Sequence, residues 1–336
     1  MTDAPDFAPR VLKAFLDTTF GPAPGFEVAR ISGGQSNPTY YVTHGGREMV
    51  LRKQPAGPIL KGAHAVDREY RVMRALCGQG VPVPRTILFH ADPAPLGTPF
   101  YLMERLQGRV FHDCALPDLA PSDRRAVYLA MAEAMARLHA VDPHAAGLSD
   151  FGPPGNYFER QIRRWMRQLR ASDGPRPDLE RVADWLAAEL PPDDGRLAVA
   201  HGDFRLGNLM FHPTEPRVIA ILDWELSTLG HPLADLGFAC MTWLCAPDEY
   251  GGIRGLDLDA LGIPERQEFV AHYHAHAAPT APLLPFHMVF ALFRFAVIFV
   301  GIADRARTGT AVDAGATRFA HLPEALAARA LDLIGA

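Results

Sequence analysis

Acidic and amide side chains gather in a short polar segment, residues 200–208, which lies between two apolar runs. Asp203 and Asn208 stand five residues apart in this segment, and Asp223 follows at the end of the apolar run 218–222. A carboxylate can accept the proton of a hydroxyl group, and carboxylate and amide oxygens are ligands that Mg²⁺ prefers. The spacing therefore indicates proton transfer beside a magnesium ion. Each aspartate taken alone is as easily a turn or cap residue, because Asp favours such places.

The same spacing, Asp-x-x-x-x-Asn, occurs in the catalytic loop of kinases, where the Asp accepts the substrate's proton and the Asn holds magnesium. An Asp at the end of a later strand, here Asp223, is the other magnesium ligand of those enzymes. Glu225 lies two residues further on. It could bind metal through a water molecule, orient a substrate hydroxyl, or cap the next turn. We therefore predict phosphoryl transfer, with Asn208, Asp223 and Glu225 as metal-binding candidates.

A small polar turn between two predicted strands is the candidate for binding nucleotide phosphates. It consists of Gly33, Gly34, Gln35, Ser36 and Asn37. Its backbone N–H groups could bind phosphate as the glycine-rich hairpin of kinases does, although the sequence is not Gly-x-Gly-x-x-Gly. A purely structural hairpin turn would have the same composition.

Arg52 is the candidate phosphate-binding cation. Aligning residues 49–52 with the Val-Ala-Ile-Lys pattern of kinases places Arg52 where those enzymes have lysine, while Lys53 points to the opposite face of the strand. Arginine can bind phosphate with two hydrogen bonds and stays charged. Glu69, on the next predicted helix, is its expected ion-pair partner; the alternative is a solvated charge on an exposed helix face.

Two segments carry a family resemblance. His-Gly-Asp-Phe-Arg-Leu-Gly-Asn at 201–208, followed by Ile-Leu-Asp-Trp-Glu at 221–225, resembles the aminoglycoside phosphotransferase and choline kinase superfamily. Residues 31–41, 50–55, 63–72 and 230–237 make the chain most similar to the phosphotransferase-like domains found near, or fused to, acyl-CoA dehydrogenases. The resemblance covers residue 7 to about residue 333.

The resemblance implies roles for individual residues. Asp203 would be the catalytic base, with His201 and Arg205 beside it in the loop, and Asp235 would support the loop from an adjoining helix. Residues 100–108 resemble the strand and hinge that bind adenine through backbone groups, which would place Met103, Glu104 and Arg105 beside the base. Many edge strands would look the same, because backbone recognition leaves little side-chain signal.

Arg294 is a cation inside an apolar helical segment, where a charge needs a partner or a water-lined cleft. We predict that it faces an anionic substrate; an internal salt bridge is the alternative. His272 and His276 would share one face of a helix that also carries His274. No carboxylate or cysteine at zinc-site spacing completes a metal site, so the sequence favours an ordinary packed or solvated role for these histidines.

These residues must be positioned by two groups of elements. The first 105 residues predict a helix at 7–20 and one at 65–79, with strands at 26–31, 39–43, 47–52, 86–90 and 100–103. The later sequence predicts helices at 122–140, 156–170, 179–190, 233–245, 265–277, 285–307 and 322–334, with short strands at 198–200, 209–211 and 218–222. We therefore expect an α+β, two-lobed kinase-like fold: a small antiparallel-sheet lobe (1–105), a helical lobe (106–336) and ATP between them.

Composition narrows the partners. With 336 residues, 48% of them hydrophobic, and a net charge of −5, the chain has no basic field that would attract nucleic acid or anionic lipid. The apolar stretch 286–302 contains His287 and Arg294 and is shorter than a membrane span requires, so we expect a buried helix. Four scattered cysteines and the lack of an N-terminal signal pattern lead us to expect a cytoplasmic protein.

The function predicted from the sequence is that of an ATP- and Mg²⁺-dependent small-molecule kinase that phosphorylates a hydroxyl group. The resemblance implies a hydroxyacyl-CoA or related hydroxy acid as acceptor, and a functional link to an acyl-CoA dehydrogenase. Two alternatives stay open. One is phosphorylation of an aminoglycoside or another amino alcohol or sugar, and the other is a non-catalytic pseudokinase that binds nucleotide.

Overall fold

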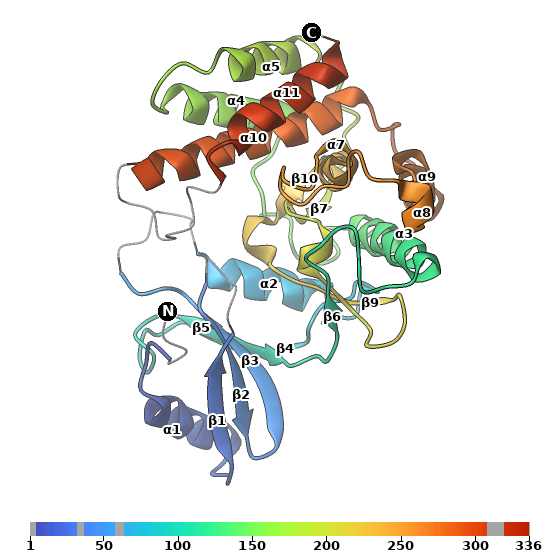
Figure 1. Ribbon diagram of the computed structural model, residues 1–336. Helices are drawn as coiled ribbons and strands as arrows, with labels where there is room; N and C mark the ends of the chain where they lie inside the picture. Colours follow the sequence, from blue (N-terminus) through green and yellow to red (C-terminus); the bar gives the residue numbers. More distant parts are fainter. Residues whose placement is uncertain (1–4, 32–36, 58–63, 308–318, 336) are drawn as a thin grey trace. The chain divides into compact units, whose positions relative to one another are not determined.

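The computed structural model describes residues 5–31, 37–57, 64–307 and 319–335. The chain divides into two compact units (Figure 1). The N-terminal unit comprises Met1–Gly108 and Ile219–Leu226, and the C-terminal unit comprises Arg109–Val218 and Ser227–Ala336. The segment Ile219–Leu226 carries Asp223 and Glu225. These two carboxylates therefore belong to the unit that contains Arg52, although the sequence groups them with the helical half of the chain.

An antiparallel sheet of five strands, in the order β1-β2-β3-β5-β4, forms the N-terminal unit (Figure 1). Its strands are β1 (Phe26–Arg30), β2 (Thr39–His44), β3 (Arg47–Lys53), β4 (Thr86–His90) and β5 (Phe100–Glu104). Alternate side chains of a strand point to one face, and those of β2, Tyr40 and Val42, are buried with Leu12 and Leu16 of helix α1 (Pro9–Phe20). The strand prediction was right for all five, with ends within one residue.

The hairpin between β2 and β3 sets the register of the strand that carries Arg52. Gly45 and Gly46 both have positive φ, 58° and 77°, and His44 pairs with Arg47. A two-residue loop of this kind is a type I′ turn, which glycine adopts without steric cost. Helix α2 (Val66–Leu76) buries one face that includes Glu69. The alternative of a solvated Glu69 is therefore wrong.

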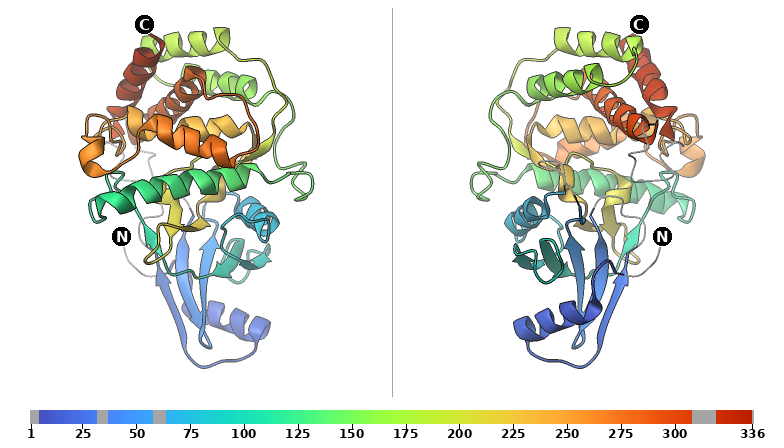
Figure 2. Two further views of the ribbon diagram at one scale, coloured as in Figure 1. Left: turned by 90° about the vertical axis from the view of Figure 1, so that its right-hand side faces the viewer. Right: turned by 90° about the vertical axis from the view of Figure 1, so that its left-hand side faces the viewer.

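Helices form most of the C-terminal unit: α3 (Pro121–His139), α4 (Tyr157–Arg170), α5 (Pro177–Ala188), α6 (Pro232–Ala239), α7 (Met241–Leu244), α8 (Leu258–Leu261), α9 (Arg266–His276), α10 (Pro285–Arg307) and α11 (Leu322–Ile334). The long helix α10 packs against α4, α5, α6 and α11 (Figure 2). By length and composition alone α10 could cross a membrane, but 72% of its most apolar window is buried inside the protein. It is thus the buried core helix that the sequence predicts.

Short strands bracket the polar segment. β7 (Ala198–Ala200) precedes it and pairs with β10 (Thr228–Gly230), and β8 (Leu209–Phe211) follows it and pairs with β6 (Arg109–Val110). β9 (Val218–Ile221) then leads to Asp223. The predicted helix 233–245 was wrong in one respect, because it is divided into α6 and α7 at Cys240. The α+β prediction itself is confirmed.

Candidate active site

One buried carboxylate fixes the backbone of the polar segment. Asp235 of α6 accepts hydrogen bonds from the backbone N–H of His201, at 2.6 Å, and of Gly202, at 2.9 Å. Gly202 has φ +83°, a conformation that glycine takes readily, and it turns the chain just before Asp203. The N–H of Asp203 in turn lies 3.2 Å from Nδ1 of the fully buried His201. The position of Asp203 is therefore set by its own loop and by α6.

The side chain of Asp203 is held by two residues of the same loop. Nδ2 of Asn208 donates to Oδ2 of Asp203 at 2.7 Å and to its backbone oxygen at 2.9 Å, and Nε of Arg205 lies 3.4 Å from the same Oδ2. The side chain of Asp203 keeps 18% of its surface exposed. This arrangement holds the carboxylate in one orientation, as a general base requires. Since both hydrogen bonds of Asn208 use its nitrogen, its Oδ1 is the atom suited to a metal ion.

Two further residues stand behind Asp235. Nε2 of His139 lies 3.2 Å from Oδ2 of Asp235, and the hydroxyl of Tyr273 lies 2.8 Å from Nδ1 of His139. Burial alone would raise the pKa of Asp235, but the hydrogen bond and charge of His139, with His201 and the Gly202 N–H, hold that pKa below its ordinary value. His139 and Tyr273 could not be identified from the sequence, because a histidine in the last turn of a helix and a tyrosine on an apolar face are common in any helical protein.

In the N-terminal unit, Arg52 bridges two carboxylates. Nε of Arg52 lies 2.8 Å from Oε2 of Glu69, which is an ion pair without the alignment of a hydrogen bond. Nη2 of Arg52 donates to Oδ1 of Asp223 at 2.7 Å. Asn37 and Tyr101 complete the shell of Glu69 with hydrogen bonds of 2.6 and 3.0 Å. Burial disfavours a charge on Arg52, but Glu69 and Asp223 outweigh it and raise its pKa. Arg52 is therefore a fixed, permanent positive charge.

Asp223 sits on a constrained backbone at the end of β9. It is a non-glycine residue with φ +62°, and its side chain is 36% exposed. The next residue, Trp224, is buried and donates from Nε1 to the backbone oxygen of Ile221 at 2.9 Å, which anchors the turn. Glu225 follows, half-buried, close enough to add to the negative field around Arg52. A left-handed conformation outside glycine is uncommon and concentrates at functional sites.

The oxygen donors fit magnesium in chemical type. Asn208 belongs to the C-terminal unit, and Asp223 and Glu225 belong to the N-terminal unit. In each unit the candidate ligand atoms are amide or carboxylate oxygens, the donors that a hard divalent cation prefers. The donor set therefore suits Mg²⁺ and carries no sulfur or imidazole that would favour zinc or copper.

Comparison with known proteins shows which family the chain belongs to. Residues 27–283 match the phosphotransferase enzyme family known as APH. The chain belongs to this family. Acyl-CoA dehydrogenase family member 10 of Mus musculus is 42% identical to this phosphotransferase over 97% of the chain. The chain spans 31% of the length of that relative, so the match concerns one part of a longer protein.

Solved structures show the same fold. A protein from Ralstonia eutropha JMP134, a candidate aminoglycoside phosphotransferase, is 41% identical to this phosphotransferase, with a TM-score of 0.87 over 98% of each chain. The aminoglycoside phosphotransferase APH(4)-Ia, solved with AMP-PNP and hygromycin B, is 17% identical, with a TM-score of 0.61 over 96% of this chain and 97% of its own. The kinase-like fold predicted from the sequence is confirmed.

In the predicted hinge of this phosphotransferase, the side chains of Glu104 and Arg105 contact other residues of the protein. Glu104 accepts from the backbone N–H of Arg85 at 2.7 Å, and Arg105 forms an ion pair with Glu48 at 3.2 Å and stacks over a tyrosine ring. Strand β5, which carries Met103, lies inside the sheet between β3 and β4 and is not an edge strand. Backbone recognition of adenine by residues Met103, Glu104 and Arg105 stays a prediction.

The predicted phosphate loop lies almost wholly outside the described residues, which include none of Gly33, Gly34, Gln35 and Ser36. Asn37 is described, and it is buried. Its side chain binds Glu69 through Nδ2 and lies 3.1 Å from Nδ1 of His64 through Oδ1. Asn37 thus holds the partner of Arg52 in place, and its side chain is not turned towards a phosphate.

Arg294 of α10 is buried, with 7% of its surface exposed, and its guanidinium carbon lies 5.9 Å from the ring centroid of Trp165. Within the described residues no carboxylate lies at ion-pair distance from Arg294. Burial, and next the charge of Arg294, lower the pKa of the neighbouring Arg164. The described residues therefore do not show the internal salt bridge that was the alternative. The guanidinium of Arg294 is a buried positive charge that could bind an anion.

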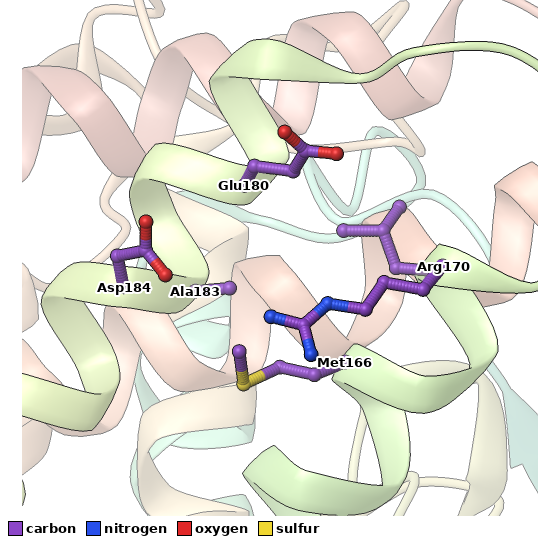
Figure 3. A pocket seen from close by; sticks show the side chains of 6 residues that line it. Met166, Arg170, Glu180, Ala183 and Asp184 are labelled. Carbon is purple, nitrogen blue, oxygen red and sulfur yellow. The ribbon is translucent and has the colours of Figure 1, made fainter.

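A small open hollow of about 190 Å³ lies between α4 and α5 (Figure 3). Its lining residues are Met166, Leu169, Arg170, Glu180, Ala183 and Asp184. Figure 3 shows the guanidinium of Arg170 reaching across from α4 towards the carboxylates that α5 presents. None of the residues predicted for chemistry lines this hollow, and it is smaller than the roughly 300–1,000 Å³ of ordinary ligand pockets. We assign it no part in the reaction.

Proposed function

We propose that this phosphotransferase moves the γ-phosphoryl group of ATP, with Mg²⁺, to a hydroxyl group of a hydroxyacyl-CoA or a related hydroxy acid. The observation that supports this most directly is the state of Asp203. Its carboxylate is oriented by Asn208 and Arg205, and it stands on a backbone that Asp235 fixes. A carboxylate prepared in this way is suited to receive the proton of an acceptor hydroxyl.

The residues divide the work as follows. Mg²⁺, when bound, neutralises charge on the phosphates, and Asn208 Oδ1, Asp223 and Glu225 are the residues that would hold it. As the acceptor oxygen bonds to phosphorus and the bond to ADP breaks, Asp203 takes the hydroxyl proton and later returns it to water. Arg52 would supply a permanent positive charge beside the phosphates, and a guanidinium group is suited to donate to phosphate oxygens.

The acyl acceptor is proposed on two grounds. The chain is 42% identical to part of a longer mouse protein named as an acyl-CoA dehydrogenase family member. In addition, Arg294 is a buried cation without a carboxylate partner in the described part of the chain, which suits an acceptor that carries carboxylate or phosphate groups. On this proposal, the acceptor of this phosphotransferase or its phosphorylated product is also a substrate or product of an acyl-CoA dehydrogenase.

The test is an acceptor screen with the purified full chain. ATP and Mg²⁺ are supplied with hydroxyacyl-CoA thioesters, their free hydroxy acids and a set of aminoglycosides, and ADP release and the mass of each acceptor are measured. We expect ADP release to depend on a hydroxyacyl acceptor, which gains one phosphoryl group. Phosphorylation of aminoglycosides alone would overturn the acyl assignment, and nucleotide binding without transfer to any acceptor would favour the pseudokinase.

Asp203→Asn tests the role of the base on the same acceptor. Removing the proton acceptor should lower kcat by about 10²–10⁴-fold and leave ATP affinity within about twofold. Asp118→Asn is the matched control, because Asp118 is exposed and lies outside the site, and it should keep full activity. Asp203→Asn protein that turns over at the rate of the control would refute the assignment.

A further inference from the structure

Two histidines of α9 meet a glutamate of α3. Figures 1 and 2 show α3 and α9 side by side, and the two helices are in contact. Nε2 of His272 lies 3.0 Å from Oε1 of Glu133, and Nε2 of His276 lies 4.0 Å from the same oxygen. The three ligand atoms all lie within 4.8 Å of one another. The carboxylate that the sequence around the histidines lacks is thus supplied by a helix more than a hundred residues away.

The side chain of His276 is oriented by its own helix. Its Nδ1 lies 2.8 Å from the backbone oxygen of His272, an acceptor, so Nδ1 donates to it and Nε2 is the ring nitrogen that faces Glu133. The rings of His272 and His276 lie 4.4 Å apart between centroids. A histidine whose second nitrogen donates to a carbonyl is the usual form of a metal ligand, because that hydrogen bond fixes both tautomer and ring orientation.

The spacing of these atoms is near that of a zinc site. Metal–ligand bonds of about 2.0–2.2 Å in a tetrahedron place neighbouring ligand atoms roughly 3.3–3.6 Å apart. The distances to Glu133 of 3.0 and 4.0 Å lie on either side of that range, so small side-chain rotations suffice. The side chains are 39%, 25% and 45% exposed for Glu133, His272 and His276, which leaves a fourth position open to water.

We propose that Glu133, His272 and His276 form a three-ligand site for Zn²⁺ that joins α3 to α9. A hydrogen bond between Glu133 and His272 accounts for one of the contacts, and a metal ion would account for both histidines facing the same oxygen. The site shares no residue with those proposed for phosphoryl transfer. His274, the third histidine of the segment, does not belong to it.

The proposed ion would hold the two helices that stand behind the catalytic loop. Tyr273 is the residue next to His272, and His139 lies at the end of the helix that carries Glu133. These two residues bond to each other at 2.8 Å, and His139 supports Asp235. Zinc at this position should therefore stabilise the C-terminal unit, whatever the acceptor of the reaction is.

The experiment measures zinc binding by untagged full-length protein with isothermal titration and follows Tm with and without ZnCl₂. We expect one tightly bound Zn²⁺ per chain and, at about a hundredfold excess over Kd, a Tm higher by at least about 3 °C. His272→Ala, His276→Ala and Glu133→Gln should each weaken this binding by at least about tenfold. When Co²⁺ replaces Zn²⁺, the protein should show an absorption band in the visible region, as intense as that of tetrahedral Co²⁺ sites.

His274→Ala is the matched control, since it removes a histidine from the same helix and should keep both the zinc affinity and the zinc-dependent rise in Tm. His276 is 45% exposed, so its alanine variant should fold normally and separates loss of a ligand from loss of structure. Equal zinc affinity in His276→Ala and wild-type protein, or a loss of binding in His274→Ala as large as in His272→Ala, would overturn the proposal.

Discussion

Two adjacent cations of β3 differ entirely in their surroundings. Arg52 bridges Glu69 and Asp223, whereas Lys53 points to the other face of the strand, where its Nζ lies 2.9 Å from Oδ2 of Asp6. Both side chains are largely buried, at 13% and 1% exposed. The alternation of a strand thus assigns one charge to the site and the other to the packing against the N-terminal segment.

We predict that Arg52→Ala lowers the free energy of unfolding by about 3–5 kcal/mol, because it leaves the buried carboxylate of Glu69 without its counter-charge. ATP affinity should fall by at least about tenfold, since a charge-assisted contact to phosphate is lost. Urea unfolding and nucleotide titration measure the two effects. The stability and ATP affinity of Arg52→Lys should lie between those of the wild type and Arg52→Ala, because lysine keeps the charge but lacks the planar guanidinium.

Lys53→Met is the control for this prediction. It also removes a buried cation from β3, but the partner it abandons, Asp6, is 32% exposed and can be solvated. Lys53→Met should therefore cost less stability and leave ATP affinity unchanged. If it weakened ATP binding as much as Arg52→Ala does, Arg52 would have no special part in holding phosphate.

The first turn of helix α6 favours a carboxylate. Pro232 occupies the first turn, His231 caps the helix by accepting from Leu233 N–H at 3.2 Å, and Asp235 lies in the same turn. Unpaired N–H groups at a helix N-terminus favour a negative charge there. Gly237 lets α6 approach α10 closely, because a Cβ at that position would lie 2.5 Å from the backbone oxygen of His287.

We predict that Asp235→Asn lowers the free energy of unfolding by about 2–4 kcal/mol, because an amide cannot accept from two backbone N–H groups and His139 at once. It should also lower kcat, since the backbone before Asp203 loses its anchor. Tyr273→Phe removes only the hydroxyl that contacts His139, and it should lower the free energy of unfolding by about 1 kcal/mol. Chemical denaturation and steady-state kinetics would check this order, and equal stability of both variants would contradict it.

At the scale of the whole molecule, two buried histidines make stability depend on pH. The rings of His231 and His287 stack with centroids 6.2 Å apart, and Asp194 lies 3.1 Å from Nε2 of His231. Burial, and then the charge of His231, lower the pKa of His287 from 6.5 to about 4. His287 is therefore neutral in the folded protein, and its Nδ1 accepts from the Leu284 N–H at 2.9 Å.

The sign of the effect follows from proton uptake. Between pH 6.5 and about 4 the unfolded chain binds a proton at position 287 that the folded protein does not bind. Stability is therefore complete above pH 6.5 and falls as the pH drops towards 4, by about 2 kcal/mol between pH 7 and pH 5 from this group. Unfolding free energies measured across this range should show the decline.

His287→Asn provides the comparison, because an amide oxygen can accept from the same N–H and does not titrate. The variant should lose less stability than the wild type between pH 7 and pH 5. His321→Asn, at an exposed position, should follow the wild-type curve. A His287→Asn curve parallel to that of the wild type would show that other groups cause the decline.

Most of the local elements, and the type of reaction that we propose, could be predicted from the order of residues along the chain. Period-two and period-3.6 patterns predicted the five N-terminal strands and the main helices, and the Asp203–Asn208 spacing indicated phosphoryl transfer, because these signals depend on neighbouring residues. Elements of two to four residues, such as β6, β10 and α8, were missed, since so short a segment holds no full period. The break at Cys240 was missed because the apolar pattern continues through it.

Which distant residues lie next to one another could be learned only from the folded structure. It placed Asp223 against Arg52, 171 residues away, it brought His139 and Tyr273 behind Asp235, and it set Glu133 beside the histidines of α9. Each of these groupings arises where the buried or facing sides of separate helices and strands pack together. Packing of that kind depends on long-range complementarity of shape and charge, which no pattern of neighbouring residues in the chain encodes.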